Sequence, residues 1–390
     1  MESLDVVEPA GNLANISINN VNKNVSISGF IKTELYHDMT LALFEHDYTR
    51  VCYVMAELAC TKNETASLFC FVVDHMSKYG LGHNVRVYTE LAQRIKTIDG
   101  LSKRNVVYNP VYQKLMCEVV MITALYSKKM HPSDFLIKEP HAIIHRLEPY
   151  VYNFGDKQHK DMANFATILD PELFKMLNLL YNRLRHKDKD AVHVIANYLL
   201  GCGCKEYTIA SVDFYVINHL KPSVRNDVVW CLWQVIHIYI TNHVKRHNKD
   251  IFQLLNDMYN AVIYLYSYLF QKKHRLTRIG YLFFILNICC EDPCKLRNKS
   301  LKTKVVNEAS RQAKALFDGI LPDSIVVRVK KPAAQMRKAQ STPADTALDT
   351  VQPPRNNCKY DYLKMYIGNE CIETDIEDEE NGENNSNLHS

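Results

Sequence analysis

Residues 35–59 read LYHDMTLALFEHDYTRVCYVMAELA, and apolar side chains recur along this stretch at every third or fourth position. This spacing places them on one face of an α-helix and is typical of an amphipathic helix. Asp47 interrupts the pattern, where its carboxylate can accept hydrogen bonds from the free backbone amides of a new helix. The stretch therefore predicts two consecutive helices, with Asp47 as the N-cap of the second.

Helical spacing continues along most of the chain. Pro110 and Pro171 are placed at the start of helices, and Gly80 follows the end of one, which are the positions these residue types favour. The further helices are predicted at residues 65–78, 84–95, 111–128, 142–146, 171–186, 189–200, 211–220, 224–246, 249–271, 273–290 and 301–317. Mostly short links between them are typical of packed antiparallel helices. Val25–Ile27 and Ile325–Val329 are candidates for short strands.

The composition agrees with a helical chain of more than one domain. Its 390 residues suffice for two or three domains of about 100–200 residues each. Only 12 residues are glycine, where average usage would give about 27. Phosphate-binding loops and hairpin turns need glycine for positive φ or a bare backbone, so a Rossmann or P-loop core is disfavoured. The sequence predicts an all-α fold of two packed multi-helix lobes; a helical-repeat array is the alternative.

Composition also divides the chain into segments. The first 28 residues are polar and rich in asparagine, whereas the chain beyond Lys330 is rich in Ala, Pro, Thr and Gln, which predicts disorder. Three prolines punctuate residues 131–169. The predicted order is a flexible arm (1–28), an N-terminal helical lobe (29–130), a linker with a short helix (131–169), a C-terminal helical lobe (170–320) and a disordered tail, basic and then acidic (321–390).

No secretory signal peptide is visible, because the first 14 residues carry acids and no basic residue. The most apolar runs, Val228–Ile240, Ala261–Phe270 and Tyr281–Cys290, are shorter than the roughly 20 residues of a transmembrane helix. We therefore expect an intracellular protein of the cytoplasm or nucleus that makes no membrane contact. Its 12 cysteines are expected to stay reduced.

The net charge of +4 conceals a separation of charge along the chain. Residues 241–338 contain 19 Lys/Arg and 7 Asp/Glu, a net charge of +12, whereas Ile372–Ser390 hold seven acids and no Lys or Arg. A concentrated positive charge attracts polyanions and predicts salt-dependent binding of DNA or RNA. The alternative is that these cations only solvate helix faces and that the acidic tail neutralises or competes for them.

The predicted nucleic-acid contacts are basic residues in this segment. They are Lys245, Arg246, Lys272, Lys273, Arg275, Arg278, Lys302 and Lys304. Within this set, Lys272, Lys273, Arg275 and Arg278 lie closest together in the sequence and are predicted to form the densest ordered patch.

Motifs for catalysis are missing from the sequence. It contains no P-loop, G-x-G-x-x-G, H-E-x-x-H, EF-hand or G-x-S-x-G pattern, so no catalytic residue, cofactor or metal site is predicted. Cys289, Cys290 and Cys294, together with His274, come nearest to a metal-ligand set; the alternative is that the cysteines finish a helix and its turn. The histidine pairs His141/His145 and His243/His247 are assigned to polar surface or core hydrogen bonds. Glu57 and Glu118 lie in apolar runs, and we expect an ion pair with Arg50 or Arg86; the alternative is a catalytic acid.

Residues 30–129, about a quarter of the chain, resemble the helical C-terminal (collar) region of AAA+ clamp-loader and replication-recombination ATPases. The resemblance rests on Thr40–Glu57, where one helix ends, Asp47 begins the next, and Tyr53 and Ala56 follow at the collar spacing. It extends to uncharacterised helical proteins of large DNA viruses. It implies a lobe that oligomerises or acts as a scaffold in replication. The ATPase modules are missing, so no ATP site is implied.

These observations predict a non-enzymatic helical interaction or scaffold protein. We expect a basic C-terminal region to bind nucleic acid in viral DNA replication or transcription, and the helical lobes to bind a protein partner or a second copy. The alternatives are a minor structural protein of a virion or assembly, and an enzyme with catalytic residues dispersed along the sequence.

Overall fold

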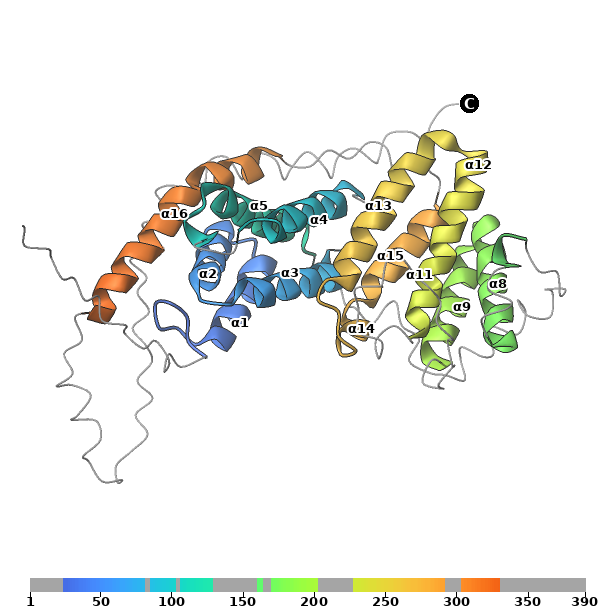
Figure 1. Cartoon of the computed structure of the whole chain (residues 1–390), viewed down its shortest axis with the longest axis horizontal. Coiled ribbons are helices and arrows are strands. Elements are labelled where there is room, and N and C mark those ends of the chain that lie inside the picture. Colours follow the sequence, from blue (N-terminus) through green and yellow to red (C-terminus); the bar gives the residue numbers. More distant parts are fainter. Residues whose placement is uncertain are drawn as a thin grey trace, which may run out of the picture.

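The computed structural model describes residues 24–80, 85–102, 106–128, 160–163, 170–202, 227–291 and 303–329. Of these residues 83% are helical and none forms a strand; Val25 and Ile31 share one isolated bridge (Figure 1). The predicted all-α fold is confirmed. The predicted helices at 142–146 and 211–220, most of the arm and of the linker, and the tail beyond residue 329 lie outside the described residues.

In the described residues, the N-terminal lobe contains five helices and one 3₁₀ turn. They are α1 (Lys32–Phe44), α2 (Tyr48–Cys60), α3 (Thr65–Tyr79), α4 (Val85–Asp99), the turn Val106–Tyr108 and α5 (Pro110–Tyr126). Asp47 caps α2 as predicted, accepting a hydrogen bond from the amide of Arg50 at 3.0 Å. His46, with φ of 52°, makes the tight turn between α1 and α2. Asn109 caps α5, and Pro110 is its first residue.

The C-terminal lobe consists of helices that run up and down between two ends. They are α8 (Pro171–Arg185), α9 (Lys189–Cys202), α11 (Val228–Ile238), α12 (Lys245–His247), α13 (Lys249–Ser267), α14 (His274–Thr277) and α15 (Ile279–Cys290). A π-helical turn, Tyr239–Val244, joins α11 to α12, so residues 228–247 form one continuous helix. The helix predicted at 273–290 is instead broken at Arg278, which separates α14 from α15.

The last helix, α16 (Thr303–Val329), packs on the N-terminal lobe, along α5 and α2 (Figure 1). The ring of Phe317 meets that of Tyr112 at 6.3 Å, and the Ser310 hydroxyl donates to Glu118 at 2.9 Å. The prediction that this segment belongs to the C-terminal lobe is wrong, because an apolar stripe does not specify which lobe it covers. The strand predicted at Ile325–Val329 is also wrong: the helix continues through it, since extending an existing helix adds a hydrogen bond per residue.

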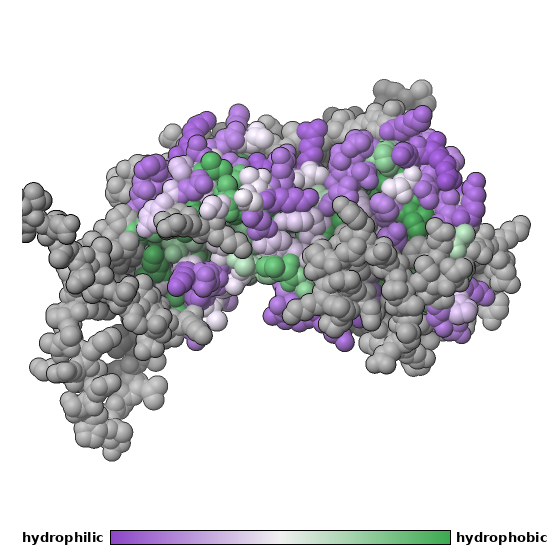
Figure 2. All heavy atoms as spheres, in the orientation of Figure 1, coloured by the Kyte–Doolittle hydropathy of each residue, from purple (hydrophilic) through white to green (hydrophobic). Residues whose placement is uncertain are grey.

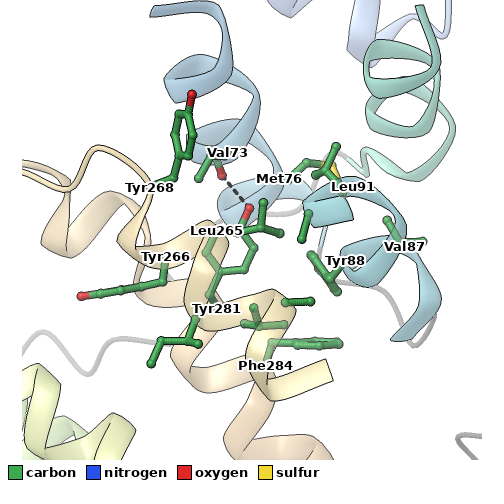
Figure 3. Packing of buried hydrophobic residues seen from close by; sticks show 14 of the residues in the cluster. Val73, Met76, Val87, Tyr88, Leu91, Leu265, Tyr266, Tyr268, Tyr281 and Phe284 are labelled. Carbon is green, nitrogen blue, oxygen red and sulfur yellow. Dashed lines mark hydrogen bonds between the residues drawn. The ribbon is translucent and has the colours of Figure 1, made fainter. Parts of the chain in front are cut away.

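The two lobes share one continuous hydrophobic core, in which α3 and α4 pack against α13, α14 and α15. Figure 3 shows Tyr281 of α15 reaching α3, where its hydroxyl donates to the carbonyl oxygen of Val73 at 2.8 Å. The ring of Tyr88 lies 5.7 Å from the ring of Tyr281 and 4.6 Å from that of Phe284. The described lobes are therefore fused by buried aromatic residues.

Candidate nucleic-acid interface

The fold separates the predicted nucleic-acid contacts. Lys245 and Arg246 precede α13, whereas Lys272 and Lys273 follow its far end, and the 19 residues of this helix span about 28 Å. Lys304 lies on α16, which packs on the other lobe. Lys302 lies outside the described residues. The described cations of the basic segment therefore do not form one surface.

Two of the predicted nucleic-acid contacts, Arg278 and Arg275, bind other residues of the fold. Arg278 is completely buried: its Nε donates to Asp74 at 2.6 Å, and its Nη1 donates to the carbonyl oxygens of Tyr266 (3.1 Å) and Tyr268. It is not available to nucleic acid, and its assignment to the patch is wrong. The physical reason is that Asp74, 204 residues earlier, supplies the opposite charge that burial of an arginine requires.

Arg275 is also largely used within the fold. Its Nη2 donates to the carbonyl oxygen of Leu200 at 3.0 Å, its Nε lies 3.2 Å from Oδ1 of Asp227, and only 13% of the side chain is exposed. Lys272 and Lys273 are therefore the two exposed members of the predicted dense patch.

A different basic surface is assembled at one end of the C-terminal lobe. We call it the basic end and define it by its exposed cationic side chains, which are Lys160, Lys187, Lys189, Lys245, Arg246 and Lys249. Figure 2 shows hydrophilic residues gathered at the upper right, where Figure 1 places α12. The up-and-down order of the helices brings the α8–α9 turn, α12 and the start of α13 to this same end.

Asp161 ties the separate segments of the basic end together. Its Oδ1 accepts a hydrogen bond from Nη2 of Arg246 at 3.0 Å, and its Oδ2 accepts one from the Tyr181 hydroxyl at 2.7 Å. Arg246 nevertheless keeps half of its side chain exposed. The carboxylate thus fixes Arg246 on α12 against α8 without removing its guanidinium from the surface.

The α8–α9 turn adjoins the C-terminal end of α15. The charges of Lys187 and Lys189 act on the Cys290 thiol, although burial is the larger effect and raises the pKa of that thiol to about 12. Tyr239, in the π-helical turn, donates from its hydroxyl to the carbonyl oxygen of Cys289 at 3.4 Å. These contacts place Lys187 and Lys189 at the same end of the lobe as α12.

The positive charge of the basic end exceeds its negative charge. Among the side chains that the structure describes at this end, the acids are Asp161, Asp188, Asp190 and Glu291, and two of them are already paired, Asp161 with Arg246 and Asp188 with Arg183 at 3.3 Å. The predicted pair His243 and His247 also lies here, with ring centroids 4.3 Å apart.

The sequence pattern did not identify Lys160, Lys187 and Lys189. Each is next to an aspartate in the sequence, so a running charge count cancels to nearly zero there. Two sequence signals could have helped to find them. The helix start at Asp170 and the link at residues 186–188 together predict where α8 ends.

The metal-ligand hypothesis fails for His274, which precedes α15, whereas Cys289 and Cys290 are at its other end, about 15 Å along the helix. Cys294 lies outside the described residues. Among the residues that the structure describes, no group of three or more His, Cys, Asp or Glu side chains could hold a metal ion. The seven cysteines whose side chains the structure describes are free thiols.

Glu57 and Glu118 are both hydrogen-bonded. Glu118 forms an ion pair with Nε of Arg94 at 2.7 Å, so the predicted ion pair exists with a different arginine. Glu57 is paired with no arginine of the described part of the chain; it accepts hydrogen bonds from Ser26 Oγ (2.6 Å) and from the amide and hydroxyl of Ser28 (both 2.8 Å). Both carboxylates therefore have structural partners.

In the described part of the chain, no helix has the length and apolar character needed to cross a membrane. Comparisons with protein-family models, with curated proteins and with solved structures find no match. The resemblance of residues 30–129 to the clamp-loader collar therefore stays a prediction.

Proposed function

We propose that this protein is a non-enzymatic helical scaffold that binds the phosphate backbone of DNA or RNA through the basic end. The observation that carries the proposal is the gathering of six exposed cations, from three separate parts of the sequence, at one end of the C-terminal lobe. Lysine and arginine side chains bind phosphates without reading bases, and they release counterions when they do so.

The elements that present these cations are held in place by the core. Lys245 has its Nζ 5.4 Å from the centroid of the Phe252 ring, a cation–π contact that holds its side chain along α13. Tyr239, Ile240 and Val244 of the preceding π-helical turn are buried. A fixed cationic surface supports binding to an extended polyanion at low cost in conformational entropy.

The test is the affinity of the full chain for duplex and single-stranded DNA of about 20 nucleotides, measured against salt concentration. Neutralising five phosphates would give a log–log slope of about −4.5 for the duplex. The variant Lys245→Gln/Lys249→Gln should reduce the magnitude of this slope by about 2. Binding with a flat salt dependence, or no binding at low salt, would overturn the proposal.

The matched control is Lys304→Gln/Lys314→Gln, which removes two exposed lysines from α16 on the other lobe. It makes the same change in net charge and should leave the slope unchanged. An equal loss of affinity in both double variants would mean that overall charge, and not the basic end, governs binding.

A second candidate function is self-association as a structural component of an assembly. Phe30 and Ile31 favour it, because they are 41% and 46% exposed at the start of α1. Sedimentation velocity without nucleic acid would detect the assembly, and Phe30→Ser/Ile31→Ser should return it to monomer.

A further inference from the structure

The loop from α13 into α14 exposes apolar side chains. Leu276 and Leu269 are 62% and 52% exposed, which makes them the two most exposed large aliphatic side chains among the described residues. Lys272 and Lys273, between them in sequence, are exposed as well. We call these four residues the α14 tip. It lies at the opposite end of α13 from the basic end.

The backbone at Leu269 is strained. Its φ of 44° is in the left-handed region, which a branched side chain such as leucine rarely adopts. The Leu269 side chain is not buried, and leucine does not favour positive φ, so neither packing nor backbone preference explains a leucine at this position. Strain of this kind is found where the surrounding structure enforces it, and it is concentrated at functional positions.

The α14 tip is anchored on both sides of Leu269. Tyr268 is buried and its hydroxyl donates to Asp99 at 3.2 Å. Phe270 is also buried, with its ring 5.1 Å from that of Trp230 and 5.1 Å from that of Tyr266. The core therefore holds the neighbours of Leu269 and leaves its side chain at the surface.

Two described acids that contact α14 or Arg278 at its end are already paired with arginines. Asp74 is paired with Arg278, and Asp227 is paired with Arg275. Lys272 and Lys273 are left exposed beside two leucines. A partner that combines apolar side chains with carboxylates fits this surface, whereas a phosphate backbone would leave the leucines uncovered.

The chain itself contains such a segment. Residues 360–380 read YDYLKMYIGNECIETDIEDEE, in which an apolar run is followed by closely spaced acids. From Val329, the last residue of α16, 31 residues lead to Tyr360. Fully extended, such a length spans about 100 Å, and as a flexible coil it averages roughly 30 Å end to end. Because the segment is tethered to the same chain, its binding at the tip would be intramolecular.

We propose that the α14 tip is a docking site for residues 360–380 of the same chain. The leucines would contact the apolar run, and Lys272 and Lys273 would pair with the acids that follow it. This inference is independent of nucleic-acid binding by the basic end, because the two surfaces lie at opposite ends of α13.

The experiment uses the full-length monomer and a carbodiimide, which joins lysine amines to carboxylates that are in direct contact. Mass spectrometry should find intramolecular links from Lys272 or Lys273 to acids within residues 373–380. Leu276→Ser should lower their yield several-fold, whereas Leu41→Ser, at an exposed position of α1, should not. Leu269→Asn should also lower the yield while it raises Tm, because asparagine tolerates positive φ.

Other outcomes would overturn the proposal. Links from the acids mainly to Lys245 or Lys249 would place the tail on the basic end. Cross-links formed only between two copies of the chain would indicate that the segment binds a second molecule and not its own. Binding of the full chain to anionic vesicles that is lost in Leu276→Ser, with no tail cross-links, would identify the tip as a membrane contact.

Discussion

The Nε of Arg278 lies 2.6 Å from Oδ1 of Asp74, and this ion pair joins α14 to α3 across the boundary between the two lobes. The arginine side chain is completely buried, whereas 26% of the aspartate side chain is exposed. The two partners are therefore not equivalent. Removal of the aspartate leaves a cation without water, whereas removal of the arginine leaves a carboxylate that water can reach.

The first prediction concerns this asymmetry. Asp74→Ala should lower the free energy of unfolding by about 3–5 kcal/mol, because it leaves the buried guanidinium unpaired. Arg278→Met should cost less, although it also leaves the carbonyl oxygens of Tyr266 and Tyr268 without a donor. Urea unfolding measures both. Arg311→Ala, at an ion pair whose arginine is 75% exposed, is the control and should change stability by less than about 1 kcal/mol.

The second prediction concerns the closest approach of α15 to α3. A Cβ atom on Gly280 would overlap the carbonyl oxygen of Ser77. Gly280→Ala should therefore destabilise the fold by about 2 kcal/mol, despite the better helix propensity of alanine. Gly319→Ala, in α16 with nothing within 4 Å of the added Cβ, should be stabilising by up to about 1 kcal/mol. Equal effects in the two variants would contradict the close packing at Gly280.

The third prediction concerns the attachment of residues 24–31 to α2. Glu57 is completely buried and accepts three hydrogen bonds from Ser26 and Ser28, and Thr61 accepts one from the amide of Ile27. Glu57→Ala should cost about 1–3 kcal/mol and should speed hydrogen exchange at the amides of Ile27 and Ser28. Unchanged exchange rates at these amides would show that other contacts hold the segment. Glu45→Ala, at an exposed position, serves as the control.

The fourth prediction concerns stability at acidic pH. Burial, and to a smaller extent the charge of Lys78, lowers the pKa of His75 from 6.5 to about 4. Between these values the unfolded chain binds a proton that the folded chain does not, so stability falls as the pH is lowered from 6.5 to 4. The loss is on the order of 3 kcal/mol.

Comparison with His75→Phe isolates this effect. Phenylalanine does not titrate and suits the aromatic surroundings of Phe44, Phe71 and Tyr79. Chemical unfolding at several pH values should show a shallower decline in the variant. A residual decline is expected, because burial also lowers the pKa values of His193 and His237. Identical slopes in the two proteins would mean that His75 is protonated in the folded state.

Local chemistry in the sequence was sufficient to place most helices. Asp47 and Asp170 accept hydrogen bonds from amides of the first turn of α2 and α8, and Pro110 begins α5, as predicted. Such signals act between residues two or three positions apart, so they need no knowledge of the rest of the fold. The same holds for the apolar spacing that predicts buried faces, and hence for the all-α class.

The candidate binding residues were predicted less well, because exposure depends on distant partners. Arg278 and Lys272 look alike in a charge count, yet one is buried against Asp74 and the other is exposed. Lys187 and Lys189 join Lys245 only because the helices alternate in direction between two ends of the lobe.

The sequence by itself determined the helices, their caps and the total charge of each segment, since these depend on neighbouring residues and on composition. Only the tertiary structure decided that α16 covers the N-terminal lobe, that Arg278 and Arg275 are held within the fold, and that the basic end and the α14 tip are separate surfaces. The physical reason is that apolar stripes and charges are satisfied by whichever complementary face lies nearby in space, at any separation along the chain.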